Sequence, residues 1–196
     1  MKEAGPPMRI EPLCPAPLEL RTERLLLTPF GPEDVPLIPG LAGAREIADT
    51  TVSIPHPYLL EHAQAFVAAA ARELAEGTDL PLAVRLLPDR RLIGATGLKG
   101  IDRQNLHAEL GYWIRTDYWG RGYATEAARA VVRYAFEELG LNRIYAHYMV
   151  RNPASGRVLE RVGMREEGRL RQAVRKWGRF EDVVLCAVLR EDPGWR

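Results

Sequence analysis

The feature that most constrains this chain is a glycine-rich turn set between a strand-like segment and an amphipathic helix. Residues 107–114 begin with alternating polar and apolar side chains, as a half-buried strand does. Residues 119–124 follow and include Gly120 and Gly122. From 125 to 139 apolar side chains recur at helical spacing, and Gly140 ends the pattern. The turn therefore has to connect the end of a strand to the N-terminus of a buried helix.

A turn of this kind points successive backbone N–H groups at one place in front of the helix. Unpaired donors and the helix dipole favour an anion there. Gly120 and Gly122 permit torsions and a close approach that a Cβ would block, and Arg121 can add positive charge. The residues alone fit a phosphate site and a purely structural turn. They do not fit the Walker A loop or the dinucleotide fingerprint, because the Lys of the first and the third glycine of the second are absent.

The rest of the chain predicts one domain of strands and helices. Residues 18–29 are typical of an edge strand, and 61–76 of a helix that Gly77 ends. Further strands are expected at 80–86, 92–98, 143–150, 170–176 and 182–189, and a short helix at 154–162. No repeat or linker divides the chain. We therefore expect a single domain at 18–190, a flexible Pro-rich tail at 1–17 and a C-terminal tail at 191–196.

Charge and cysteine content narrow the class of function. With 27 basic and 26 acidic residues, the formal net charge is +1, which argues against a protein that grips nucleic acid through its phosphates. Cys14 and Cys186 form no metal-ligand spacing, and no apolar run is long enough for a membrane span. We therefore expect a cytoplasmic protein with no metal site, no membrane contact and no nucleic-acid binding of its own.

Several segments together resemble the GNAT acetyltransferases. Residues 119–124 resemble their pyrophosphate-binding motif, Gln/Arg-x-x-Gly-x-Gly/Ala, with Gly122 and Ala124 at matching positions and Trp119 in place of the usual Gln or Arg. The segments that resemble the subfamily of ribosomal-protein N-terminal acetyltransferases lie at 21–25, 55–58, 152–155, 162–168 and 178–182. Any one motif is weak, but their order across residues 18–190 is specific.

The resemblance implies an α+β fold of three layers. It predicts a mixed, mostly antiparallel sheet of seven strands, with helices on both faces and a V-shaped splay between strands 4 and 5. Acetyl-CoA is the implied cosubstrate, with its pantetheine arm on the backbone of Tyr112, Trp113 and Ile114 and its pyrophosphate at the turn. Asn152, which is also typical of a helix N-cap, would help to position it. The implied cofactor-binding residues are Tyr112, Trp113, Ile114, Trp119, Gly120, Arg121, Gly122, Tyr123, Ala124, Thr125, Asn152 and Ser155.

Acetyl transfer needs a base for the amine proton and a donor for the departing thiolate. Glu109, at the start of the cofactor strand, is the preferred candidate base, and His147, on the next strand, is the second; either could instead be structural. Many relatives carry the donor Tyr seven residues after the Asn, where this chain has Leu159. Ser155 is the substitute we expect. No Ser/His/Asp or Cys/His set supports covalent catalysis, so direct transfer in a ternary complex is expected.

The resemblance leaves three functions open. The leading one is acetylation of a protein N-terminus, such as that of a ribosomal protein. The second is acetylation of a small amine, namely an amino acid, a polyamine or an aminoglycoside. The third is a non-catalytic CoA-binding module that kept the fold. The sequence does not decide whether the protein forms a homodimer.

Overall fold

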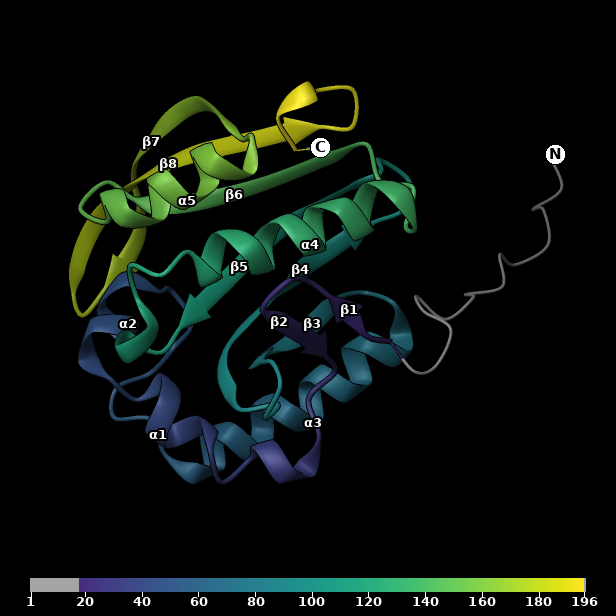
Figure 1. Cartoon of the computed structure of the whole chain (residues 1–196). Coiled ribbons are helices and arrows are strands. Elements are labelled where there is room, and N and C mark those ends of the chain that lie inside the picture. The colour runs from purple at the N-terminus through teal and green to yellow at the C-terminus, as the bar shows by residue number, and fades with distance from the viewer. Residues whose placement is uncertain (1–17, 196) are drawn as a thin grey trace, which may run out of the picture.

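The computed structural model describes residues 18–195, so the tail expected at 1–17 lies outside it. Within these residues the centre is one eight-stranded sheet, in the order β1-β2-β3-β4-β5-β6-β8-β7 (Figure 1). All neighbouring strands are antiparallel except β5 and β6, which are parallel. The strands are β1 (Leu20–Arg21), β2 (Leu25–Thr28), β3 (Leu80–Leu86), β4 (Leu92–Asp102), β5 (His107–Ile114), β6 (Arg143–Met149), β7 (Arg165–Lys176) and β8 (Arg179–Leu189). The helices are α1 (Ile38–Ala42), α2 (Arg45–Thr50), α3 (Leu60–Glu76), α4 (Tyr123–Glu137) and α5 (Pro153–Val162), with short 3-10 turns at Pro32–Asp34, Thr116–Tyr118 and Pro193–Trp195.

The sheet has eight strands rather than the expected seven because the first expected strand is a hairpin. The Thr22 N–H donates a hydrogen bond to the Leu25 carbonyl, and the Leu25 N–H donates one to the Thr22 hydroxyl oxygen, both at 2.9 Å. The chain therefore turns back, and Leu20 pairs with Leu27. The mixed, mostly antiparallel class of the sheet is confirmed.

Helices cover both faces of the sheet, as expected (Figure 1). The alternation of β3 shows the two faces: Leu82 and Val84 are buried in the cluster that contains Phe136 of α4, whereas Ala83 between them packs with Val67 of α3. Burying an apolar side chain of this size stabilises the fold by ~1.5–3 kcal/mol. The faces of α3 and α4 therefore hold the helices on opposite sides of the same strands.

The ends of the elements follow local chemistry. Gly77 ends α3 and has φ 71°, a left-handed conformation that favours glycine. Gly94 of β4 is also required, because a Cβ there would lie 2.3 Å from the Trp113 carbonyl oxygen on β5. Trp195, beyond the expected domain boundary at 190, is buried, and its ring lies 4.8 Å from that of Phe136. The folded unit thus includes the last described residues.

Candidate active site

The parallel pair β5 and β6 separates after three residues. His107, Ala108 and Glu109 pair with β6, and no partner on β6 follows for the remainder of β5 among the described residues. β4 and β5 stay paired as far as Ile114. The expected splay between strands 4 and 5 is therefore the gap between β5 and β6.

The pairing with β4 decides which backbone groups of β5 face the gap. The N–H of Arg115 donates to the Ile93 carbonyl on β4 at 2.8 Å. Because hydrogen bonding alternates along a strand, the backbone of Trp113 also faces β4, while that of Tyr112 and Ile114 faces the gap. The expectation that Trp113 offers free backbone groups is therefore corrected: among the described residues, the backbone groups of Tyr112 and the N–H of Ile114 are free on this side, while the Ile114 carbonyl accepts a hydrogen bond from the Trp119 side chain.

The glycine-rich turn lies at the N-terminus of α4. Gly120 and Gly122 have φ values of 73° and 81°, which explains why glycine stands at both positions. Among the described residues, no protein acceptor takes the backbone N–H groups of residues 120–125. Successive free N–H groups at the positive end of a helix dipole form an anion site.

Trp119 has a role that its departure from the family motif did not suggest. Its indole Nε1 donates a hydrogen bond of 2.6 Å to the Ile114 carbonyl, so the turn is tied to the end of β5. The neighbouring Arg121 directs its guanidinium over the Tyr118 ring, 5.6 Å from the centroid. Where the family motif has Gln or Arg, Trp119 therefore holds the glycine-rich turn against the end of β5.

Glu126, in the first turn of α4, anchors the turn to the N-terminal hairpin. Its carboxylate accepts hydrogen bonds from the Thr22 hydroxyl at 2.6 Å, the Arg24 N–H at 2.9 Å and the Arg24 Nε at 2.7 Å. Burial alone would raise the pKa of Glu126, but these bonds and the Arg24 charge outweigh it and lower the pKa. Arg24 also donates to the Arg121 carbonyl at 3.0 Å, which fixes the turn from outside.

The N-terminus of α5 faces the same part of the gap. Asn152 is the N-cap, and its side-chain oxygen accepts the N–H of Ser155 at 3.3 Å. The Ser155 hydroxyl lies 2.8 Å from the Tyr112 hydroxyl, which also donates to the Ser155 carbonyl at 3.1 Å. Burial raises the pKa of Tyr112 far more than its hydrogen bond with Ser155 lowers it, so the phenol stays protonated. Leu159 is buried and serves packing.

The two candidate bases lie together as one pair. His147 Nδ1 is 3.1 Å from Glu109 Oε1, and both side chains are partly exposed. A carboxylate only accepts hydrogen bonds, so Nδ1 carries the proton in this contact and Nε2 of a neutral ring is left as an acceptor.

The pair lies on the other face of the sheet from Tyr112 and Ser155. Along β5, side chains alternate, so Glu109 points with Trp113 to the side of α3, while Tyr112 points to the side of α4 and α5. The splay is the opening between the two sides.

One cleft of about 1170 Å³ joins nearly all of the expected site residues. The expected site residues among those that line it are Glu109, Tyr112, Trp113, Ile114, Trp119, Gly120, Gly122, Tyr123, Ala124, Thr125, His147, Asn152 and Ser155. Arg121 alone of the expected set does not line it. The Tyr112 hydroxyl was not anticipated, because the sequence indicated only its backbone.

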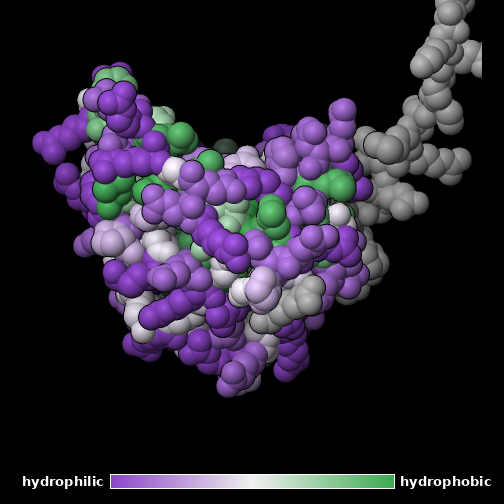
Figure 2. Space-filling model, turned by 90° about the horizontal axis from the view of Figure 1, so that it is seen from above, coloured by the Kyte–Doolittle hydropathy of each residue, from purple (hydrophilic) through white to green (hydrophobic). Residues whose placement is uncertain are grey.

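Seen from the side of β7 and β8, the surface is mainly hydrophilic and shows apolar side chains in separate patches (Figure 2). No helix within residues 18–195 has the length and apolar character that a membrane span needs.

Comparison with known proteins agrees with this geometry. The family model of the acetyltransferase (GNAT) domain matches residues 24–165. The Bacillus subtilis protein YdaF, provisionally named a ribosomal N-acetyltransferase, is 40% identical over 107 residues, which are 55% of this chain and 58% of YdaF. The Escherichia coli [ribosomal protein uS5]-alanine N-acetyltransferase is 33% identical over 105 residues, 53% of this chain and 54% of that protein.

These two matches span little more than half of each relative's length. A crystal structure of a GNAT-family acetyltransferase from Bacillus anthracis extends the likeness to the whole fold. It superposes with a TM-score of 0.78 at 26% identity and covers 89% of this chain and 99% of that one. The chain belongs to the GNAT family of acetyltransferases.

Proposed function

We propose that this protein transfers the acetyl group of acetyl-CoA to the N-terminal α-amino group of a protein. The observation that carries the proposal is the splay itself. It has unpaired backbone groups of β5 on one edge, the free N–H groups of residues 120–125 at its end, and a polar pair on its other side. A cofactor bound along the splay would meet an acceptor that enters from the side of α3.

Each part of the cofactor has a matching part of the site. The backbone groups of Tyr112 and the N–H of Ile114 suit the amide-rich pantetheine arm, which would extend β5 as an added strand does. The N–H groups of residues 120–125 suit the pyrophosphate. Arg121, outside the cleft, adds positive charge near the same turn.

On the acceptor side, His147 is the proposed base and Glu109 its positioning residue. Bound acetyl-CoA supplies a thioester carbonyl for the amine to attack. Nε2 of His147 takes the proton that the amine nitrogen loses, while Glu109 holds the Nδ1 proton and stabilises the imidazolium that forms. Since an α-amino group has a pKa of ~8, a base of ordinary strength is enough.

On the cofactor side, Ser155 is the proposed proton donor for the departing thiolate. The Ser155 hydroxyl can pass its proton to the thiolate, and Tyr112, which lies 2.8 Å away and stays protonated, can donate a hydrogen bond to the Ser155 oxygen until that oxygen regains a proton from solvent. The acceptor and the thiolate are thus served by different groups from opposite faces of the sheet, which suits direct transfer without a covalent enzyme intermediate.

The names of the two relatives support a protein N-terminus as acceptor, and acetylation of a small amine is the alternative. A thiol-release assay with acetyl-CoA tests both. The amines offered are N-terminal peptides, free amino acids, polyamines and an aminoglycoside. The proposal expects the highest kcat/KM with peptides. A higher kcat/KM with a polyamine or an aminoglycoside would mean that the acceptor is a small amine and not a protein N-terminus. No thiol release with any amine would refute catalysis.

A further inference from the structure

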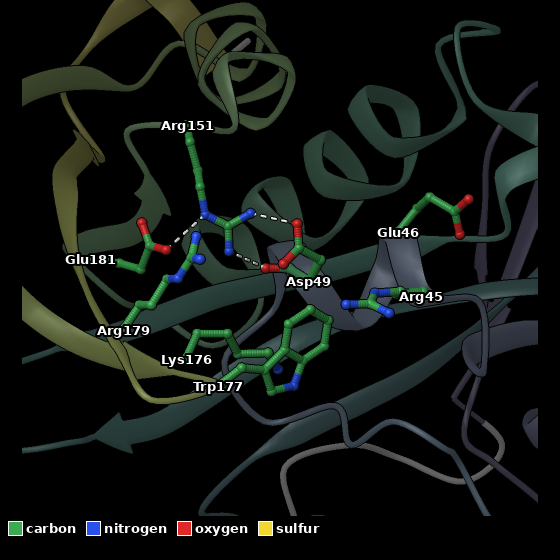
Figure 3. Close-up of a pocket in the computed structure, with 8 residues that line it drawn as sticks. All are labelled: Arg45, Glu46, Asp49, Arg151, Lys176, Trp177, Arg179 and Glu181. Carbon is green, nitrogen blue, oxygen red and sulfur yellow. Dashed lines mark hydrogen bonds and ion pairs between the residues drawn. The ribbon is translucent and has the colours of Figure 1, made fainter.

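A second pocket, of about 570 Å³, lies between α2 and the turn that joins β7 to β8. Its lining is almost entirely charged and consists of Arg45, Glu46, Asp49, Arg151, Lys176, Trp177, Arg179 and Glu181. Figure 3 shows Arg151 between Asp49 and Glu181, with Lys176 and Trp177 on the wall beside them. The pocket is separate from the proposed cofactor site, and none of the site residues named above lines it.

The ion pairs in this pocket leave positive charge in excess. Arg151 pairs with Asp49 at 2.6 Å and with Glu181 at 3.0 Å, so one cation engages two carboxylates. Among the described residues, no carboxylate lies within ion-pair distance of Arg45, Lys176 or Arg179.

The third carboxylate of the pocket does not neutralise these cations. Among the described residues of the lining, Glu46 is the only carboxylate besides Asp49 and Glu181, and in Figure 3 Arg45 lies between Glu46 and Lys176. Three cationic side chains therefore line a pocket in which two of the three carboxylates are already paired with Arg151.

Lys176 is the clearest sign that an anion belongs here. Lys176 is only 7% exposed, yet within the part of the chain that the structure describes the one hydrogen bond of its ammonium is to the Ile54 carbonyl at 3.0 Å. An ammonium has three donors, so two remain for a ligand. Burial lowers the pKa of Lys176, against the nearby charge of Asp49, which shows that the protein does not fully compensate the buried charge.

Trp177 gives the pocket a flat wall with two cations close to it. The Arg45 guanidinium lies 5.2 Å and the Lys176 ammonium 5.4 Å from the ring centroid. Trp177 itself has φ 47°, a left-handed conformation at a tight hairpin where Asn or Gly is usual. A bulky residue kept in such a conformation is typical of a functional position.

The pocket adjoins the acceptor side of the main cleft. Ile54, whose carbonyl Lys176 contacts, lines that cleft, and so does Asn152, the residue after Arg151. α2 forms a wall of both spaces, with Asp49 toward the pocket and Thr50 toward the cleft. A ligand that enters the splay from this side would pass the three cations.

We propose that Lys176, Arg45 and Arg179 bind a carboxylate of the acceptor, so that the acceptor is an amine that also carries a carboxylate. This inference rests on the proposed function. The carboxylate could be an Asp or Glu side chain close to a protein N-terminus, or the α-carboxylate of a free amino acid. A polyamine is disfavoured, because its charges would meet unpaired cations.

The test compares matched acceptors that differ only in this charge. N-terminal peptide amides with Glu or Gln after the first residue test the side-chain source, and alanine against alaninamide tests the α-carboxylate. We expect the acidic member of one pair to have a kcat/KM roughly tenfold or more above its neutral partner, since hydrogen bonds to charged groups are worth about that much. Equal kcat/KM within both pairs would overturn the inference.

Variants then assign the effect to the pocket. Lys176→Met and Arg45→Gln should each remove most of the preference, mainly by raising KM for the acidic acceptor, and leave KM for the neutral one unchanged. Arg133→Gln, an arginine on α4 outside the pocket, is the matched control and should keep the preference. Equal losses for acidic and neutral acceptors would mean a structural role only. If Lys176→Met lowers the melting temperature strongly, Arg45→Gln alone decides, because Arg45 forms no ion pair with any residue in the described range 18–195.

A binding measurement keeps this inference distinct from catalysis. The N-acetylated forms of the Glu and Gln peptide amides need no turnover, so calorimetry can compare their affinities for the wild-type protein. Tighter binding of the Glu form, abolished by Lys176→Met, would support the pocket even if no amine were acetylated. Equal affinities within this pair and also between N-acetylalanine and N-acetylalaninamide would refute the pocket even if acetyl transfer were confirmed.

Discussion

Gly122→Val tests the proposed cofactor cradle with the least disturbance of the core. Gly122 has φ 81°, and a Cβ there would meet nothing closer than the Arg24 guanidinium at 3.4 Å. The main cost to the apo protein is therefore the left-handed conformation, which disfavours an L-residue by ~1–2 kcal/mol. For a domain of this size each kcal/mol lowers the Tm by about 2–4 °C, so the variant should remain folded.

The effect on the ligand should be much larger. The valine side chain would project among the N–H groups of residues 120–125, and hydrogen bonds to a charged group are worth ~1.5–3 kcal/mol each. Losing one of them weakens binding by about ten- to a hundredfold. With free CoA at ~100 times the wild-type Kd, protection is ~2.7 kcal/mol for the wild type and would fall to ~0.4–1.4 kcal/mol for the variant.

Thermal melts with and without CoA measure both effects. Gly140→Val is the matched control: Gly140 has φ 68° at the other end of α4, and a Cβ there meets nothing within 4 Å. The control should lose similar apo stability and keep its CoA protection. Undiminished protection in Gly122→Val, or equal loss in both variants, would refute the assignment of the turn as the pyrophosphate site.

Three further outcomes are expected. Ser155→Ala should lower kcat by ~10²-fold and change the Kd for CoA little, which stopped-flow and equilibrium titration can separate; an unchanged kcat would leave water as the donor. Glu126→Gln should lower the free energy of unfolding by ~1–3 kcal/mol near pH 7, as denaturant titration would show, because it removes the charged acceptor of the Thr22 and Arg24 bonds. Since the folded-state pKa of Glu126 is lowered, its contribution is present above the unfolded-state value and is lost as pH falls through the folded one, so wild type and variant should converge in acid; a constant difference would contradict this. Glu109→Gln should lose rate most near neutral pH and recover as the amine deprotonates itself above ~8, and a pH–rate profile equal to wild type would exclude a role for Glu109.

The sequence predicted the parts of the site that depend on neighbours along the chain. The turn at Gly120 and Gly122 and the N-cap at Asn152 are local features, and the structure has both. α2 escaped notice because six residues are too few to show helical periodicity. The first strand was expected in one piece because nothing in its apolar pattern marks the turn that Thr22 closes with Leu25.

Contacts between distant residues could not be predicted in the same way. Tyr112 and Ser155 are 43 positions apart, and their hydroxyls meet only because β5 diverges from β6 beside α5. Trp119 was expected only as a cofactor-binding residue, and its bond to Ile114 was not anticipated, since it depends on the path of the whole turn. When the partner of a side chain lies on another element, its role depends on how the elements are arranged, and a single sequence does not show that arrangement.

The contact between Glu109 and His147 means that the two candidate bases can act together, His147 as the base and Glu109 as its positioning residue, and kinetics can test this. The residues are 38 positions apart, so the sequence presented them as rival bases, while the structure brings them to 3.1 Å. If His147 takes the proton and Glu109 only holds its tautomer, removing Glu109 matters solely through His147. The double variant Glu109→Gln, His147→Gln should then be no slower than His147→Gln alone, since residues that act as one unit are not additive. Additive losses in kcat would mean that each side chain acts on the acceptor independently, and the assignment of Glu109 as a positioning residue would fail.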